Sequence, residues 1–166
     1  RYLLVEERVK GLLTLNQPAG HVEDGESLIE AVVREVREET AWEFAPEALV
    51  GIYRWRRNDA GDTFFRFCFT GRLVRHHEGQ PLDPDITRTL WLTPAELTAQ
   101  AARHRSPLVG RCLADHLAGR RYPLALLGAF WLLLPRAVPG KPLAALLWLP
   151  LLWPPVERPR RGEVEL

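Results

Sequence analysis

Three glutamates crowd the end of one expected helix. Glu35, Glu38 and Glu39 are spaced i, i+3 and i+4, so a helix brings their side chains together within one turn. Their like charges repel, and a helix C-terminus disfavours negative charge. A bound divalent cation explains the arrangement, because hard cations such as Mg²⁺ bind carboxylate and phosphate oxygens. The alternative is a solvated acidic helix face with Arg34 and Arg37 as counter-ions.

The residues before this turn have a spacing that favours the metal-binding interpretation. Five residues separate Gly20 from Glu26, seven separate Glu26 from Arg34, and residues 35–42 read Glu-Val-Arg-Glu-Glu-Thr-Ala-Trp. This segment resembles the Nudix box: Gly, five residues, Glu, seven residues, Arg-Glu, an aliphatic residue, any residue, Glu-Glu, any residue, Gly and a hydrophobic residue. Ala41 is the one departure, in the place of the second glycine.

The resemblance implies a metal-dependent hydrolase of phosphoanhydride bonds, with Mg²⁺ or Mn²⁺ as its cofactor. The metal ligands that it implies are the backbone carbonyl of Gly20 and the carboxylates of Glu35, Glu38 and Glu39. Glu35 or Glu38 would also deprotonate or orient the attacking water. Arg34 would hold the carboxylates in place, and Glu26 would brace the loop against the helix.

Other segments resemble one bacterial subgroup of Nudix phosphatases, which acts on hydroxymethylpyrimidine pyrophosphate, thiamine pyrophosphate and nucleoside di- and triphosphates. The similarity covers residues 1 to about 127 and includes residues 16–21, 85–86, 105–109 and 121–124. It implies release of inorganic phosphate. Two alternatives stay open: a nucleoside triphosphate pyrophosphatase or oxidised-nucleotide sanitising Nudix enzyme, and a non-catalytic Nudix ligand-binding module.

Four further residues are candidates for binding the substrate. Arg66, on an expected strand, can reach a phosphate, and Asp85 can act as an additional base or metal ligand. Trp55 can stack on a base, and Tyr122 can line the same pocket. The alternatives are a surface charge for Arg66, a loop acid for Asp85 and ordinary core or rim aromatics for the other two.

The elements that position these residues follow from periodicity and turn signals. We expect a hairpin over residues 1–15, a loop over 16–25 and a helix over 27–40 that is capped by Ser27 and Glu30. Strands are expected over 49–55, 63–73 and 89–92. One further helix is expected to start at Pro94, and another to span 107–117. Residues Ile29, Val32, Val33 and Val36 form the expected apolar stripe of the first helix. The class is α/β, and the resemblance implies a Nudix fold, a mixed sheet sandwiched between helices.

Composition narrows the range of partners. The 166 residues carry a net charge of +1, which gives no reason to expect a nucleic acid polymer or an acidic membrane as partner. We expect a cytoplasmic enzyme, a monomer rather than a dimer, that acts on a small pyrophosphate. The two cysteines, Cys68 and Cys112, are expected to be reduced thiols.

The two ends of the chain differ from the rest. The chain opens directly on the apolar run at residues 2–5, so the first strand of the fold is expected to be missing. Residues 128–166 form a tail rich in Leu, Trp and Pro, whose apolar runs are too short to cross a membrane. We expect a Nudix domain over 1–127 followed by this tail, which is either a genuine extension or a reading-frame error.

Overall fold

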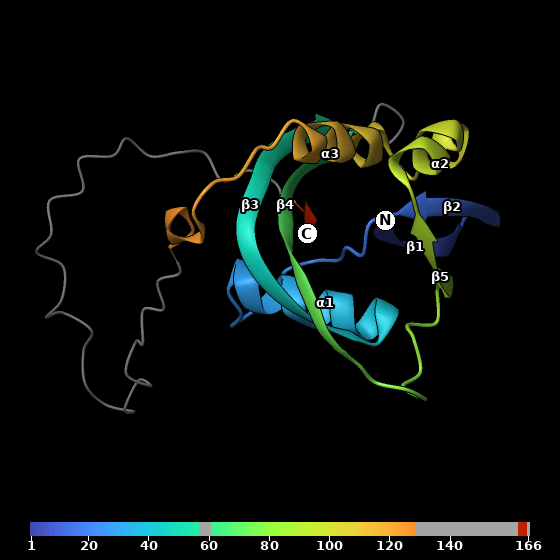
Figure 1. The fold of residues 1–166 in the computed structure, drawn as a ribbon, viewed down its shortest axis with the longest axis horizontal. Coiled ribbons are helices and arrows are strands. Elements are labelled where there is room, and N and C mark those ends of the chain that lie inside the picture. Colours follow the sequence, from blue (N-terminus) through green and yellow to red (C-terminus); the bar gives the residue numbers. More distant parts are fainter. Residues whose placement is uncertain (57–60, 129–162, 166) are drawn as a thin grey trace, which may run out of the picture. The chain divides into compact units, whose positions relative to one another are not determined.

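The computed structural model describes residues 1–56, 61–128 and 163–165, and in these the strands form two three-stranded sheets (Figure 1). The first sheet has the antiparallel order β2-β1-β5, built from β1 (Tyr2–Val9), β2 (Leu12–Asn16) and β5 (Ile86–Leu92). The second has the order β3-β4-β6, in which β3 (Trp42–Arg56) and β4 (Thr63–His76) form a long antiparallel hairpin and β6 (Glu163–Glu165) pairs parallel to β4.

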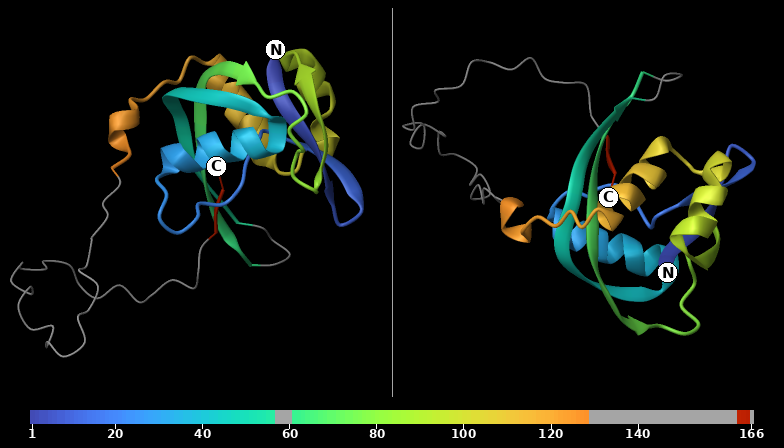
Figure 2. Two further views of the ribbon diagram at one scale, coloured as in Figure 1. Left: turned by 90° about the horizontal axis from the view of Figure 1, so that it is seen from below. Right: turned by 45° about the horizontal axis from the view of Figure 1, so that its top comes forward.

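The helices close the space between the two sheets. They are α1 (Leu28–Thr40), α2 (Pro94–Ala99) and α3 (Pro107–Leu117), with short 3-10 turns at Ala101–Arg103 and Leu124–Leu126. Figures 1 and 2 show α1 and α3 on opposite sides of the interior that lies between the β3–β4 hairpin and the β1 sheet. The α/β class is confirmed, although the described strands divide between two sheets instead of joining in one.

Both ends of α1 are set by local chemistry. Ser27 caps the first turn, and the Ser27 and Glu30 side chains each accept a hydrogen bond from the other residue's backbone N–H, as the sequence predicts. The helix ends at Ala41, whose φ of 59° is left-handed and whose N–H bonds to the Arg37 carbonyl. Alanine costs about 1 kcal/mol there relative to glycine. The departure from the Nudix box therefore changes the stability of the helix end but not its position.

One face of α1 packs on the β3–β4 hairpin. Val32 and Val36 are buried as expected, together with Ala31, and Val33 packs at their side. Ile29 is half-buried and lies outside this cluster. The partners from the rest of the chain are Val22, Trp42, Phe44, Phe69 and Leu73. This packing fixes which way the glutamates on the neighbouring face of α1 point.

Several strands are longer than their sequence patterns predict, including β3 and β1. β3 starts at Trp42, because the irregular register around Pro46 lets the strand continue past a residue that cannot donate to the ladder. β1 runs on through Glu6, which is buried because Arg88 and Arg103 both form ion pairs with it. The expected turn around residue 60 lies partly outside the described residues.

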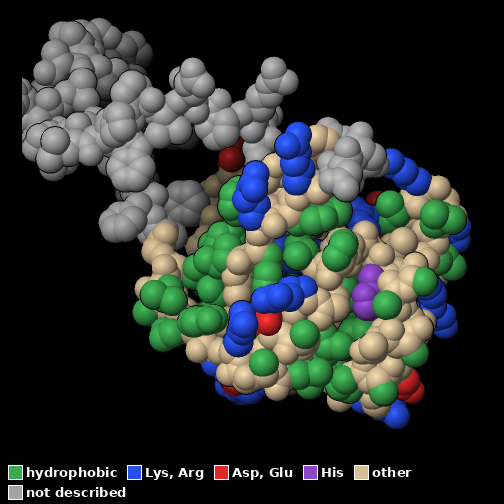
Figure 3. Space-filling view, turned by 90° about the horizontal axis from the view of Figure 1, so that it is seen from above, with side chains coloured by type: hydrophobic (Ala, Val, Ile, Leu, Met, Phe, Trp, Pro, Cys, Tyr) green, Lys and Arg blue, Asp and Glu red, His purple; other side chains and the backbone are tan. Residues whose placement is uncertain are grey.

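The surface seen from the side of α3 mixes residue types (Figure 3). Hydrophobic and basic side chains are interspersed over this face, and few acidic ones show. Within the described part of the chain, none of the helices has the length and apolar character needed to cross a membrane. Most of the expected tail, residues 129–162 and 166, lies outside the described residues.

Candidate active site

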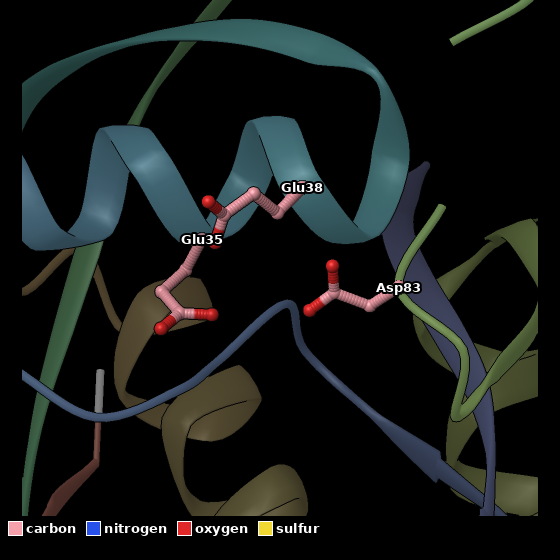
Figure 4. Close-up of side chains that lie close together, drawn as sticks. All are labelled: Glu35, Glu38 and Asp83. Carbon is pink, nitrogen blue, oxygen red and sulfur yellow. The ribbon is translucent and has the colours of Figure 1, made fainter. Parts of the chain in front are cut away.

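Three carboxylates from two parts of the chain converge beside α1. Glu35, Glu38 and Asp83 each place a carboxylate oxygen within 4.8 Å of the others. Figure 4 shows the two glutamates extending from α1 and Asp83 approaching from the loop before β5. The Asp83 N–H donates to the Glu38 carbonyl over 3.2 Å, which ties that loop to the helix. Such a cluster of oxygen donors fits a hard divalent cation.

Glu39 lies on the same turn but is held differently. Its Oε2 accepts a hydrogen bond of 2.9 Å from the backbone N–H of Ala19, and it is not part of the three-carboxylate cluster. Burial raises the pKa of Glu39 to about 8, and burial also raises the pKa of Glu35. Removal from water disfavours the charged forms of both groups. A cation beside them would compensate for that loss, so the donor set and its burial both fit a metal ion.

Gly20 lies directly against the cluster. A Cβ atom built on Gly20 would come within 2.1 Å of the Glu35 carboxylate carbon. A side chain at position 20 would therefore displace either the Glu35 carboxylate or the loop, and glycine avoids both. This close approach is the physical reason for the glycine that begins the motif.

Arg34 connects the motif through one guanidinium group. It bonds both oxygens of Glu26, at 3.0 Å from Nε and 2.6 Å from Nη2, and its Nη1 donates to Glu35 at 2.7 Å and to Glu38 at 2.9 Å. Nη2 also donates to the His21 carbonyl at 2.9 Å. These contacts hold the pKa of Glu26 below its usual value. Arg34 thus fixes the carboxylate rotamers and attaches the loop to α1.

A cavity of about 520 Å³ is lined by residues that neighbour the motif along the chain, although the clustered carboxylates are not in its wall. Gln17 and Pro18, just before Ala19 and Gly20, form part of its wall, as do Val32 and Val36 of α1. Arg66 also lines the cavity. Its side chain is buried and donates to Gln17 at 3.3 Å and to Asn16 at 3.1 Å. Arg66 therefore places a fixed positive charge in the cavity wall.

The other three predicted substrate residues lie elsewhere. Trp55 stacks on Phe64 with ring centroids 5.5 Å apart, and it lines a separate cavity of about 720 Å³ beside α3. Tyr122 pairs through its backbone with Leu49 and is not in the wall of the 520 Å³ cavity. The backbone carbonyl of Asp85 accepts a hydrogen bond of 3.0 Å from the backbone N–H of Arg8, and the Asp85 carboxylate is not part of the cluster. The structure thus does not bring these three together with Arg66.

Asp83 is the residue that sequence reasoning missed. It lies two positions before Asp85, in the same loop, and outside the Nudix box. Burial, followed by the negative charge of Glu38, raises its pKa. The signal in the sequence was a second acid in a loop, and only the folded loop shows which of the two reaches the helix.

Comparison with known proteins assigns this site to a family. The NUDIX domain family matches residues 1–111. Phosphatase NudJ of Escherichia coli strain K12 is 38% identical over 130 residues, covering 78% of this chain and 84% of that protein. A NUDIX hydrolase structure from Nitrosomonas europaea is 48% identical, with a TM-score of 0.76 over 77% of this chain and 87% of the other. The MutT protein of Methanosarcina mazei Go1 shares the fold, with a TM-score of 0.58 at 19% identity, over 72% of this chain and 85% of the other.

The fold and the site define an enzyme that hydrolyses phosphorus-containing acid anhydrides of small molecules. The chain belongs to the Nudix hydrolase family. The Nudix fold implied by the sequence is confirmed.

Asp83 and Asp85 form a matched pair for testing the loop. We expect Asp83→Asn to weaken Mg²⁺ activation by about tenfold, because a neutral amide replaces one of the three clustered carboxylates. Asp85→Asn removes the same charge two residues away and is expected to change the activation constant by less than about twofold. Titration of activity with Mg²⁺ measures both constants. Equal effects from the two variants would contradict the assignment to Asp83.

Proposed function

We propose that this Nudix hydrolase uses Mg²⁺ to release inorganic phosphate from small diphosphates, with hydroxymethylpyrimidine pyrophosphate, thiamine pyrophosphate and nucleoside di- and triphosphates as the substrate class. The observation that carries the proposal is the convergence of Glu35, Glu38 and Asp83 at α1, the helix that also supplies Val32 and Val36 to the wall of the cavity that contains Arg66. The carboxylates suit a cation that binds phosphate oxygens, and the cavity has room for the organic part of the molecule.

The residues have separate tasks in this proposal. The cation is held by the carbonyl of Gly20 and by the carboxylates of Glu35, Glu38, Glu39 and Asp83. Arg34 keeps Glu35 and Glu38 in place, and Glu26 braces the loop against the helix through Arg34. A bound Mg²⁺ or Mn²⁺ neutralises phosphate oxyanions and lowers the pKa of water. Glu35 or Glu38 orients the attacking water and accepts its proton. Arg66 balances charge on the phosphate that lies nearer the cavity.

The choice of substrate follows the relatives. Proteins named phosphatase NudJ match 78% of this chain at 38% identity, which supports release of phosphate over release of pyrophosphate. The cavity wall is mostly apolar and includes Phe44, Phe67 and Trp91, which suits a flat ring. The described site contains every carboxylate of the Nudix box, which disfavours a non-catalytic binding module.

The remaining proposals concern the whole chain. We propose that residues 1–127 form the catalytic domain, that residues 128–166 are a tail of unknown role, and that the enzyme works as a monomer in the cytoplasm. The low cysteine content, two residues in 166, supports a reducing compartment.

Hydrolysis in ¹⁸O-labelled water tests the reaction. Thiamine pyrophosphate, hydroxymethylpyrimidine pyrophosphate and nucleoside di- and triphosphates are each incubated with the enzyme and Mg²⁺, and the products are analysed by mass spectrometry. We expect label in released inorganic phosphate, because water attacks the terminal phosphorus. Pyrophosphate from triphosphates, with no action on diphosphates, would instead establish the nucleotide pyrophosphatase alternative. A chelator-treated sample, restored by added Mg²⁺, serves as the control for metal dependence.

A further inference from the structure

His116, at the end of α3, joins three parts of the chain through its ring. Nδ1 lies 2.8 Å from the hydroxyl of Tyr2 on β1, and Nε2 lies 3.0 Å from the hydroxyl of Thr70 on β4. The Nη2 of Arg121 lies 2.7 Å from the same Nε2. The rings of Tyr2 and His116 also meet edge to face, with centroids 5.3 Å apart. Tyr2, Thr70 and His116 all line the cavity that contains Arg66.

Arg121 fixes the direction of these hydrogen bonds. A guanidinium group only donates, so Nε2 of His116 must accept. Burial, followed by the positive charge of Arg121, lowers the pKa of His116, so the ring is neutral at neutral pH. A neutral imidazole carries one proton. That proton therefore lies on Nδ1 and is donated to the hydroxyl of Tyr2.

The Tyr2 hydroxyl is consequently left with its own proton to donate. Among the residues that the structure describes, His116 is the one hydrogen-bond partner of this hydroxyl. Burial raises the pKa of Tyr2, so the hydroxyl keeps its proton over the working range of an enzyme. Because Tyr2 lines the cavity, the proton is available to an acceptor on a bound molecule.

We propose that Tyr2 is a specificity-determining residue that donates a hydrogen bond to a ring nitrogen or carbonyl oxygen of the substrate. This inference rests on the proposed function, in which the ring of the substrate occupies this cavity while its diphosphate lies at the carboxylates. Much of the wall is apolar, including Val32, Val36 and Phe44. One donor with a fixed direction in such a wall distinguishes a nitrogen heterocycle from a hydrocarbon ring of the same size.

Two diphosphates with rings of equal size test the inference. Values of kcat/KM are measured with Mg²⁺ for pyrimidinylmethyl diphosphate and for benzyl diphosphate, which lacks a ring acceptor. We expect the native enzyme to prefer the pyrimidine by about tenfold, the size of one neutral hydrogen bond. Tyr2→Phe is expected to reduce this preference to within about twofold by lowering the pyrimidine value alone.

Tyr53→Phe is the matched control. The Tyr53 hydroxyl, like that of Tyr2, hydrogen-bonds a residue of α3, here by donating to Asp115 at 3.0 Å, but Tyr53 does not line the cavity. Both variants therefore lose a hydrogen bond between a tyrosine hydroxyl and α3. Tyr2→Phe alone also loses a hydrogen-bond donor in the cavity wall. Thermal unfolding of both variants shows whether either has lost its fold. The Tyr53→Phe enzyme is expected to keep the native preference.

Nitrogen NMR of the native enzyme gives a second measurement that needs no variant. We expect the His116 ring to carry its proton on Nδ1, and a proton on Nε2 would overturn the proposal. An unchanged preference in Tyr2→Phe would overturn it too, while leaving the proposed function intact. If the native enzyme hydrolyses neither diphosphate, the proposed function fails and the inference falls with it.

Discussion

Replacing Glu38 or Glu39 by glutamine is expected to lower kcat by at least about 100-fold. Glutamine keeps the size of each side chain and removes its charge, so the change tests charge alone. A 100-fold loss corresponds to about 2.7 kcal/mol of transition-state stabilisation, which is within the range that a cation held by carboxylates supplies. Steady-state hydrolysis of a diphosphate at saturating Mg²⁺ measures the effect.

Glu47→Gln provides the charge-matched control for this experiment. Glu47 is exposed and forms an ion pair with Arg72 over 3.0 Å. Exposed pairs of this kind contribute about 1 kcal/mol or less to stability, so kcat should change by less than about twofold. If kcat falls by less than threefold in both Glu38→Gln and Glu39→Gln, the glutamates form a solvated acidic helix face and not a metal site.

Gly20→Ala is expected to lower kcat/KM by about 100-fold. The added Cβ cannot coexist with the Glu35 carboxylate carbon at 2.1 Å, so either the carboxylate or the loop must move. A displacement of about 1 Å in a catalytic group is enough for a loss of this size. Kinetics over a range of Mg²⁺ concentrations will show a weakened response to the metal together with the lower rate.

A double-mutant cycle identifies the residue through which Gly20 acts. Glu35→Asp withdraws the carboxylate from the space that a Cβ on residue 20 would occupy. If the clash with Glu35 causes the loss, adding Gly20→Ala to Glu35→Asp will have little further effect. Gly110→Ala is the control for the substitution itself, because its Cβ would meet nothing closer than 3.8 Å. Additive losses in the cycle would show that Gly20 acts independently of Glu35.

The sequence predicts the elements that local chemistry controls. The Ser27–Glu30 cap forms as its residues indicate, the second helix starts at Pro94 as expected, and the fixed spacing of the box places Glu35 and Glu38 together. These features depend on residues that are close along the chain, so periodicity and spacing contain the information.

The parts that sequence reasoning did not predict depend on distant contacts. Asp83 reaches the helix because its loop bonds to the Glu38 carbonyl. Glu6 is buried within β1 because two arginines from later segments neutralise it. Trp55 lies in another cavity, where it stacks on Phe64 of β4 and shares the wall with residues of α3. In each case the deciding partner is far away in the sequence.

The contacts of Arg34 also bear on how the carboxylates of α1 are ordered. Its guanidinium bonds both Glu35 and Glu38, so it serves as an internal counter-ion for these two carboxylates. Folding has then already met the entropic cost of ordering these side chains, about 1.5–2 kcal/mol for each glutamate. The positions of these two carboxylates are thus set in advance by the folded chain, so the site is preorganised for its reaction rather than assembled during it.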